Sequence, residues 1–184
     1  MTNEQKIELK NGTAVKKNRT ADVRPGLLIA SLGIPLAVGV VSSLLTSDAM
    51  KIFHFMNKPP LSPPGWLFPI VWTILYLMMG LASYYVFRSE ADRSIKRTGL
   101  ALYGAQLVFN FFWSLLFFNA SLYMVSFIWL MIMWALTIMT MLYFHKADRK
   151  AGWMMLPLVV WTTFAAYLNL GIYILSITPS IQHR

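Results

Sequence analysis

Aromatic and amide side chains recur at helical spacing in the middle of the chain, where they have the greatest capacity to bind another molecule. One row repeats at intervals of three and four residues and consists of Tyr103, Gln106, Asn110, Trp113 and Phe117. That spacing places its members on one face of a helix. Amides form directional hydrogen bonds, and indole rings offer flat surfaces for stacking and dispersion. Such a face is suited to bind a flat, largely apolar molecule.

Two other apolar stretches carry rows with the same spacing. These rows are Trp72, Tyr76, Met79 and Ser83, and Trp161, Ala165, Leu168 and Ile172, with Asn169 beside the second row. An amide in an apolar environment needs a hydrogen-bond partner, so Gln106 and Asn110 are expected to face inward. Two roles are open for these amides. They could form interhelical hydrogen bonds, worth ~0.6 kcal/mol each on average, or they could line a pocket.

The other reactive residue types are few, which narrows the function. The chain has no Cys, so disulfides, thiol catalysis, iron–sulfur clusters and cysteine-ligated zinc are excluded. His54, His145 and His183 are not at metal-ligand spacing, and no metal site is predicted. The long apolar stretches contain no Asp, Glu, Lys or Arg, whereas pumps and ion-coupled carriers keep ionisable groups at membrane depth. The sequence therefore favours binding or moving an apolar molecule.

Long helices are needed to position these rows, and the charge pattern indicates where they lie. Of the 184 residues, 57% are apolar and 12% are charged, against ~25% charged in a typical soluble domain. A span needs about 20 apolar residues to cross a ~30 Å hydrocarbon core. The charge-free stretches supply five such spans, the third stretch dividing at the turn signal Asn119-Ala120-Ser121. We predict an all-α membrane protein, a five-transmembrane-helix bundle with helices near 26–46, 64–87, 99–118, 122–145 and 152–175.

The basic residues predict the orientation of this 26–175 domain. All 16 Lys and Arg except Lys51, Lys58 and Arg184 lie in the N-terminal tail and in the loops at 88–98 and 146–151. With five spans these segments share one side, which the positive-inside rule assigns to the cytoplasm. We therefore expect a multi-pass protein of the cytoplasmic membrane, with its N-terminus in the cytoplasm and its C-terminus outside. Because the net charge of +9 is mostly an orientation signal, no nucleic-acid partner is expected.

The two ends of the chain flank that domain as tails. Residues 1–25 are polar and basic, and their composition predicts a disordered cytoplasmic tail. Residues 176–184 form a short C-terminal tail.

A proline-rich segment precedes the second predicted helix. It runs Lys58-Pro59-Pro60-Leu61-Ser62-Pro63-Pro64-Gly65-Trp66. Clustered prolines give a stiff, extended chain, and Pro64 suits the first turn of the helix that follows. The segment is either a plain linker or a rigid lid, since the 47–62 loop is long enough to fold back across the outer ends of the helices.

Three motifs in separate predicted helices carry a more specific signal. They are Pro-Pro-Gly-Trp66-Leu-Phe68-Pro-Ile-Val71-Trp72-Thr-Ile-Leu75-Tyr76-Leu-Met-Met79-Gly80, Tyr103-x-x-Gln106-Leu-x-x-Asn110-x-x-Trp113, and Pro157-x-x-x-Trp161-x-x-Phe164-Ala165-x-x-Leu168-Asn169. With these motifs the chain resembles, over residues 26–175, the TspO/MBR family. This family contains the tryptophan-rich sensory proteins and the translocator protein, or peripheral benzodiazepine receptor.

The resemblance implies a five-helix bundle with a ligand pocket beside the long first loop. Members of the family accept porphyrins such as protoporphyrin IX, haem, cholesterol in animals, and benzodiazepine- or isoquinoline-type drugs. Matched to this sequence, the implied ligand-binding residues are Trp66, Phe68, Trp72, Tyr76, Gln106, Asn110, Trp113, Trp161, Phe164, Ala165, Leu168 and Asn169. No cofactor is required, porphyrin or haem being the ligand. The lipid bilayer is the expected partner, and the resemblance also suggests a homodimer.

Three functions follow from the resemblance, and the sequence leaves the choice between them open. The leading one is a membrane receptor or sensor for porphyrins and similar planar hydrophobic ligands. The second is light- and oxygen-dependent degradation of protoporphyrin IX, for which Trp72 and Trp161 would be the catalytic pair. The third is transport of porphyrins. In each case the porphyrin propionates are expected at the wet mouth of the pocket, where Lys51 or Lys58 would pair with them.

The sequence departs from the family pattern in two places. Leu158 follows Pro157, where the family often has Pro-Tyr. No basic residue lies within five positions after Tyr173, so the animal cholesterol-recognition stretch is missing. Sterol binding by that route is therefore not expected.

Overall fold

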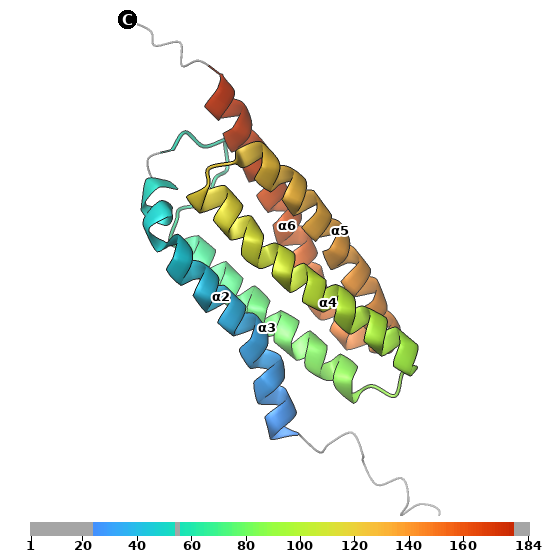
Figure 1. The fold of residues 1–184 in the computed structure, drawn as a ribbon. Helices are drawn as coiled ribbons and strands as arrows, with labels where there is room; N and C mark the ends of the chain where they lie inside the picture. The colour runs from blue at the N-terminus through green and yellow to red at the C-terminus, as the bar shows by residue number, and fades with distance from the viewer. Residues whose placement is uncertain (1–23, 54–55, 179–184) are drawn as a thin grey trace, which may run out of the picture.

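The computed structural model describes residues 24–53 and 56–178, with side chains for 24–47 and 56–178. Nearly all of the predicted N-terminal tail and most of the C-terminal tail lie outside these residues. The described chain forms the helices α2 (Pro25–Phe53), α3 (Leu67–Arg88), α4 (Arg93–Ser114), α5 (Tyr123–Ala147) and α6 (Arg149–Ile177), with a π-helical turn η1 (Leu115–Asn119) continuing α4 (Figure 1). Five spans are long and apolar enough to cross a membrane. The predicted five-helix membrane bundle is confirmed.

The helices begin and end near the predicted positions, although α6 begins three residues early, at Arg149, and three other ends also differ. α2 continues to Phe53 instead of ending near residue 46, which shortens the expected loop before α3. α4 begins at Arg93 instead of near residue 99, because charged residues at a helix end can remain in the membrane surface and need not interrupt the helix. α3 begins at Leu67, so Pro64 precedes the helix, contrary to the prediction; the Leu67 N–H donates to the Pro64 carbonyl in a turn, at 3.0 Å. The residue before a proline is biased to an extended backbone, and Gly65 is a poor helix former, so the helix starts later.

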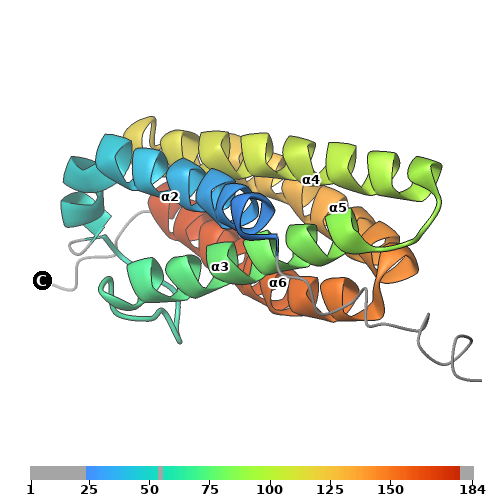
Figure 2. The same ribbon diagram turned by 90° about the horizontal axis from the view of Figure 1, so that it is seen from below.

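The helices form a closed ring in which α2 packs on α3, α3 on α6, α6 on α5 and α5 on α4, while α4 and η1 return to α2 (Figures 1 and 2). α3 is the most enclosed span, with 44% of its most apolar 18-residue stretch buried, and α2 is the least enclosed, with 17%. The turn after η1 is held by Ser121 in the left-handed region at φ 53°, and the Asn119 amide donates to the Leu45 carbonyl of α2 at 2.9 Å. This contact ties the third predicted span to the first.

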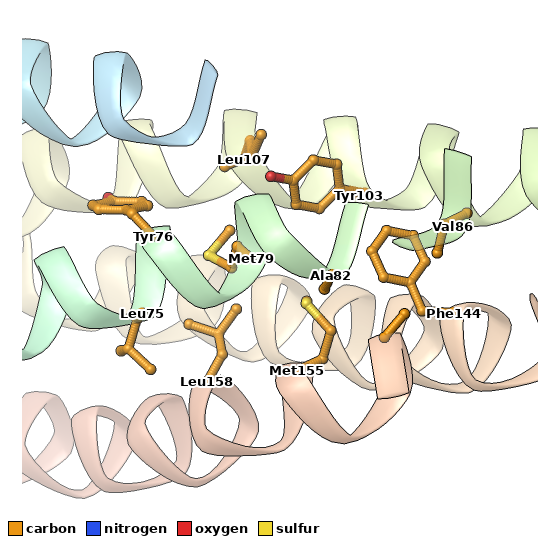
Figure 3. Close-up of a cluster of buried hydrophobic side chains, with 11 residues drawn as sticks. Leu75, Tyr76, Met79, Ala82, Val86, Tyr103, Leu107, Phe144, Met155 and Leu158 are labelled. Atoms are coloured by element: carbon orange, nitrogen blue, oxygen red, sulfur yellow. The ribbon is translucent and has the colours of Figure 1, made fainter. Parts of the chain in front are cut away.

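One half of the bundle is filled by a dense hydrophobic core (Figure 3). Met79 and Val86 of α3 meet Phe144 of α5 and Met155 and Leu158 of α6, all almost completely buried. Gly152 permits the close approach of α5 and α6, because a Cβ there would lie 2.7 Å from the His145 Cα. The packing leaves this part of the bundle closed.

The proline-rich segment lies across the end of α6. The Tyr167 hydroxyl donates to the Pro60 carbonyl at 2.8 Å, and the Gly171 backbone lies against the Pro59 ring. Within the segment, the Ser62 hydroxyl donates to the Pro59 carbonyl at 2.7 Å, and Leu61 adopts a positive φ of 64°. These contacts favour the lid interpretation over a plain linker. We call the end of the molecule where Pro59 and Pro60 contact α6 the proline-loop end.

Candidate functional site

A cavity of about 360 Å³ lies at the proline-loop end, between α2, α3 and the junction of α4 with η1. Its volume is within the ~300–1,000 Å³ range of small-molecule sites. The lining residues are Gly39, Ser42, Ser43, Thr46, Ser47, Gly65, Trp66, Phe68, Pro69, Trp72, Tyr76, Trp113, Ser114 and Phe118. The predicted site residues Trp66, Phe68, Trp72, Tyr76 and Trp113 are therefore brought together around one space.

Aromatic rings form a continuous wall on the side of α3 and α4. The Trp72 ring centroid lies 5.5 Å from that of Tyr76 and 6.3 Å from that of Trp113. Trp113 in turn stacks on Phe117 at 5.5 Å. Trp66, at the start of α3, is 65% exposed. Rings in this arrangement offer flat apolar faces to a ligand, with one exposed indole among the lining residues.

Tyr76 borders the cavity because of a glycine on the neighbouring helix. A Cβ at Gly39 would lie 2.3 Å from the Tyr76 ring, so only glycine lets the ring rest against the α2 backbone. The Tyr76 hydroxyl donates to the Asn110 side-chain oxygen at 2.7 Å. Asn110 thus does not line the cavity itself, and its hydrogen bond holds the Tyr76 side chain in position.

The opposite wall was not predicted from the sequence. It is made by the small and hydroxyl-bearing residues of α2: Gly39, Ser42, Ser43, Thr46 and Ser47. Their spacing of three and four residues was a usable signal. Small residues in a membrane helix are commonly explained by close helix packing, and only the bundle shows that this face borders a cavity.

The remaining predicted site residues lie outside the lining of the cavity. The ring centroids of Trp161 and Phe68 lie 5.8 Å apart in an edge-to-face contact, so the Phe68 ring lies between Trp161 and the cavity. The ring centroid of Phe164 lies 5.7 Å from that of Trp161. Ala165 and Leu168 are buried in the core beside them. Gln106 is fully buried, and neither of its amide atoms has a hydrogen-bond partner among the described residues.

Asn169 forms the hydrogen bonds expected of an interhelical contact. Its side-chain oxygen accepts from the Trp113 indole at 3.2 Å and from the Ser126 hydroxyl at 3.1 Å. Its side-chain nitrogen donates to the Tyr123 carbonyl at 2.7 Å. Of the two roles left open for the buried amides of this protein, Asn169 has the structural one, and it reaches the site through the Trp113 ring that it orients.

In the described part of the chain, no group of three His, Asp or Glu residues comes together. His145 packs against Trp153 at the end opposite the cavity. His54 and His183 lie outside the described residues, and so does the Lys51 side chain that was expected at the mouth.

Comparison with known proteins identifies the family. The sequence pattern of the TspO/MBR family matches residues 31–175, which is most of the chain. The chain belongs to the TspO/MBR family. The prediction made from the three motifs is therefore confirmed, and the five-helix membrane bundle agrees with membership of that family.

Relatives with this similarity occur in bacteria and animals. The chain is 34% identical over 146 residues to the tryptophan-rich protein TspO of Chlorobaculum tepidum, covering 79% of this chain and 92% of the relative. It is 36% identical over 141 residues to the tryptophan-rich sensory protein of Cereibacter sphaeroides, covering 77% and 84%. The translocator protein of Ovis aries is 29% identical over 126 residues, covering 68% and 75%. The alignments thus extend across most of the bundle.

Proposed function

We propose that this TspO/MBR protein is a membrane receptor or sensor that binds porphyrins and related planar hydrophobic ligands in the cavity at the proline-loop end. The observation that carries the proposal is the aromatic wall, in which Trp72, Tyr76 and Trp113 present neighbouring rings to one cavity. Flat aromatic ligands gain dispersion and offset stacking from such a wall. No charged side chain is among the described residues of the lining, which fits a ligand with an apolar body.

The size of the cavity determines how a porphyrin would lie. At about 360 Å³ the cavity is at the small end of ligand sites, so a tetrapyrrole plate would fill it and leave an edge at the mouth. That edge would carry the propionates, since ionised groups are costly to bury. Pairing of the propionates with Lys51 or Lys58 is a further part of this proposal.

Binding can be tested by titrating the purified protein in detergent with protoporphyrin IX and following quenching of tryptophan fluorescence. Trp72→Leu is expected to weaken binding about three- to tenfold, because it removes an indole of the wall. Trp153→Leu is the matched control, since that indole packs on His145 at the opposite end of the bundle. Equal losses in both variants would contradict a site at the proline-loop end.

Light-dependent degradation of protoporphyrin IX is the second candidate function, and the position of Trp72 in the cavity wall supports it. An electron-rich indole beside an excited porphyrin and oxygen is suited to photo-oxidation. Of the two expected catalytic residues, Trp72 lines the cavity while Trp161 is one ring removed. Incubation in light and in darkness, followed by absorbance and product mass, distinguishes binding from turnover. If the pigment is degraded only in light, Trp72→Phe should slow the reaction more than Trp161→Phe does.

The orientation in the membrane and the oligomeric state complete the proposal. The distribution of basic residues supports an orientation with the N-terminus in the cytoplasm and the proline-loop end outside. Because the chain has no Cys, a single cysteine at Leu61 or at Ser94 can be labelled from one side at a time. Labelling of the Leu61 variant from outside the cell supports this orientation.

The homodimer is a proposal of the same kind and is tested by mass measurement in mild detergent.

A further inference from the structure

The α2 wall of the cavity carries a row of hydroxyl groups opposite the aromatic wall. Ser42, Ser43, Thr46 and Ser47 all line the cavity. Ser42 and Thr46 are buried, whereas Ser43 and Ser47 are exposed. The cavity is therefore two-sided, with flat apolar rings on one wall and small oxygen-bearing side chains on the other.

The hydroxyl groups of this row differ in how they use their hydrogen-bonding capacity. Inside a membrane helix, Ser and Thr commonly donate to a carbonyl one turn back in the same helix. Thr46 donates to the Ser42 carbonyl at 2.9 Å, and Ser47 donates to the Leu44 carbonyl at 3.2 Å. Ser42 and Ser43 form no such bond to any described residue. Two donors on the cavity wall are thus unused.

A buried hydroxyl without a hydrogen-bond partner lowers the stability of the folded protein. Ser42 is only 4% exposed, and its Oγ atom has no partner in the described part of the protein. Buried polar groups are almost always hydrogen-bonded, and one without a partner destabilises the folded state. A ligand that supplies an oxygen acceptor at this wall would remove that cost, so the wall selects for such a ligand.

We infer that Ser42 and Ser43 form a specificity subsite that donates hydrogen bonds to one carboxylate of a planar ligand, while a second carboxylate stays at the mouth and the indoles hold the apolar face. This inference rests on the proposed function and assigns the ligand's orientation within the same cavity. The hydroxyl row continues outward to Ser47, so a polar edge lying along α2 would run from the buried Ser42 to the mouth. The covered Ser42 Oγ reaches the ligand by rotation about one side-chain bond between staggered rotamers.

Recognition of the carboxylates can be distinguished from binding of the ring by comparing two porphyrins that share one ring and differ in their carboxylates. Mesoporphyrin IX carries two propionates, and etioporphyrin III has ethyl groups in their place on the same ring. The experiment measures the dissociation constants of both for the wild-type protein and for Ser42→Ala and the double variant Ser42→Ala/Ser43→Ala. Ser31→Ala is the matched control, because Ser31 is on the same helix, is also 4% exposed and also lacks a described partner, but does not line the cavity.

The expected result is a selective loss. Ser42→Ala should weaken mesoporphyrin IX binding about three- to tenfold, the range expected from the loss of one hydrogen bond, and the double variant should weaken it further. Binding of etioporphyrin III should change less than twofold in every variant, and Ser31→Ala should bind both porphyrins as the wild type does. Equal effects on the two porphyrins, or no effect on either, would overturn the subsite. If the wild-type protein binds neither porphyrin, the proposed function itself fails.

Discussion

The α2–α3 side and the α5–α6 side of the bundle use the same residue types with opposite results. On the α5–α6 side, Asn169 uses both atoms of its amide in hydrogen bonds, and Gly152 lets two helix backbones meet. On the α2–α3 side, Asn110 has one bonded atom and one without a described partner, and Gly39 admits a tyrosine ring next to a cavity. An amide or a glycine in a membrane helix therefore predicts close contact but does not indicate whether the contact closes a core or borders a site.

The difference has a physical basis in enclosure. Asn169 of α6 lies between α4 and α5, so its amide finds partners on both of these helices. α2 is the least enclosed span, and its inward face meets aromatic side chains that have few polar atoms to offer. A helix face with small residues and few polar neighbours leaves both space and unused hydrogen-bonding groups, which are what a ligand site needs.

The largest effect is expected from Asn169→Leu on the closed side. The substitution removes three hydrogen bonds and leaves the Trp113 indole without its partner, whereas the Ser126 hydroxyl keeps its bond to the Tyr123 carbonyl. The free energy of unfolding should fall by about 3 kcal/mol, measured by denaturant titration in detergent micelles. Asn110→Leu, which removes the single bond to Tyr76, should cost clearly less. Equal losses of unfolding free energy in the two variants would show that the amides on the two sides contribute equally to stability.

Gly152→Ala is expected to have the next largest effect. The new Cβ would lie 2.4 Å from the His145 Cβ and 2.7 Å from its Cα, so α5 and α6 would have to separate. We expect a loss of about 2 kcal/mol in the free energy of unfolding, the cost of overpacking a close helix contact. Thermal unfolding followed by circular dichroism measures it, and an unchanged melting temperature would contradict the close contact.

Gly39→Ala makes the matching change on the open side. Its Cβ would meet the Tyr76 ring instead of a backbone, and the ring has the cavity to move into. Stability should fall by less than about 1 kcal/mol, chiefly through the Tyr76–Asn110 bond, while protoporphyrin IX affinity falls several-fold because the ring occupies ligand space. A variant that lost stability but kept full affinity would place Tyr76 outside the site.

Gln106→Met should have the smallest effect. The amide forms no hydrogen bond with any described residue, so an apolar side chain of similar length removes no protein contact. The free energy of unfolding should change by less than about 0.5 kcal/mol or increase, since an unpaired buried amide is costly. A loss above 1 kcal/mol, measured as for Asn169→Leu, would show that Gln106 has a partner such as a bound water.

The architecture of this protein could be predicted from its amino-acid sequence. Long charge-free spans satisfy their backbone groups internally when they are helical, so hydropathy sufficed to predict five helices, and the turn signal Asn119-Ala120-Ser121 predicted the turn between the third and the fourth. Charged helix ends and a proline cluster do not have this constraint, which is why the start of α4 and the start of α3 were misplaced. The motifs around Trp72, Gln106 and Trp161 were sufficient to predict the family.

The residues that surround the cavity could not be predicted in the same way, because they depend on how the helices pack. Periodicity gives the face of a helix on which a residue lies, but not the distance or tilt between that face and its neighbours. Trp72 and Trp113 therefore came to line the cavity, Trp161 came to lie one ring away, and Asn169 was used for packing. The hydroxyl wall around Ser42 depended on the same geometry, because a small residue borders a cavity only where the opposing side chains do not fill the space it leaves.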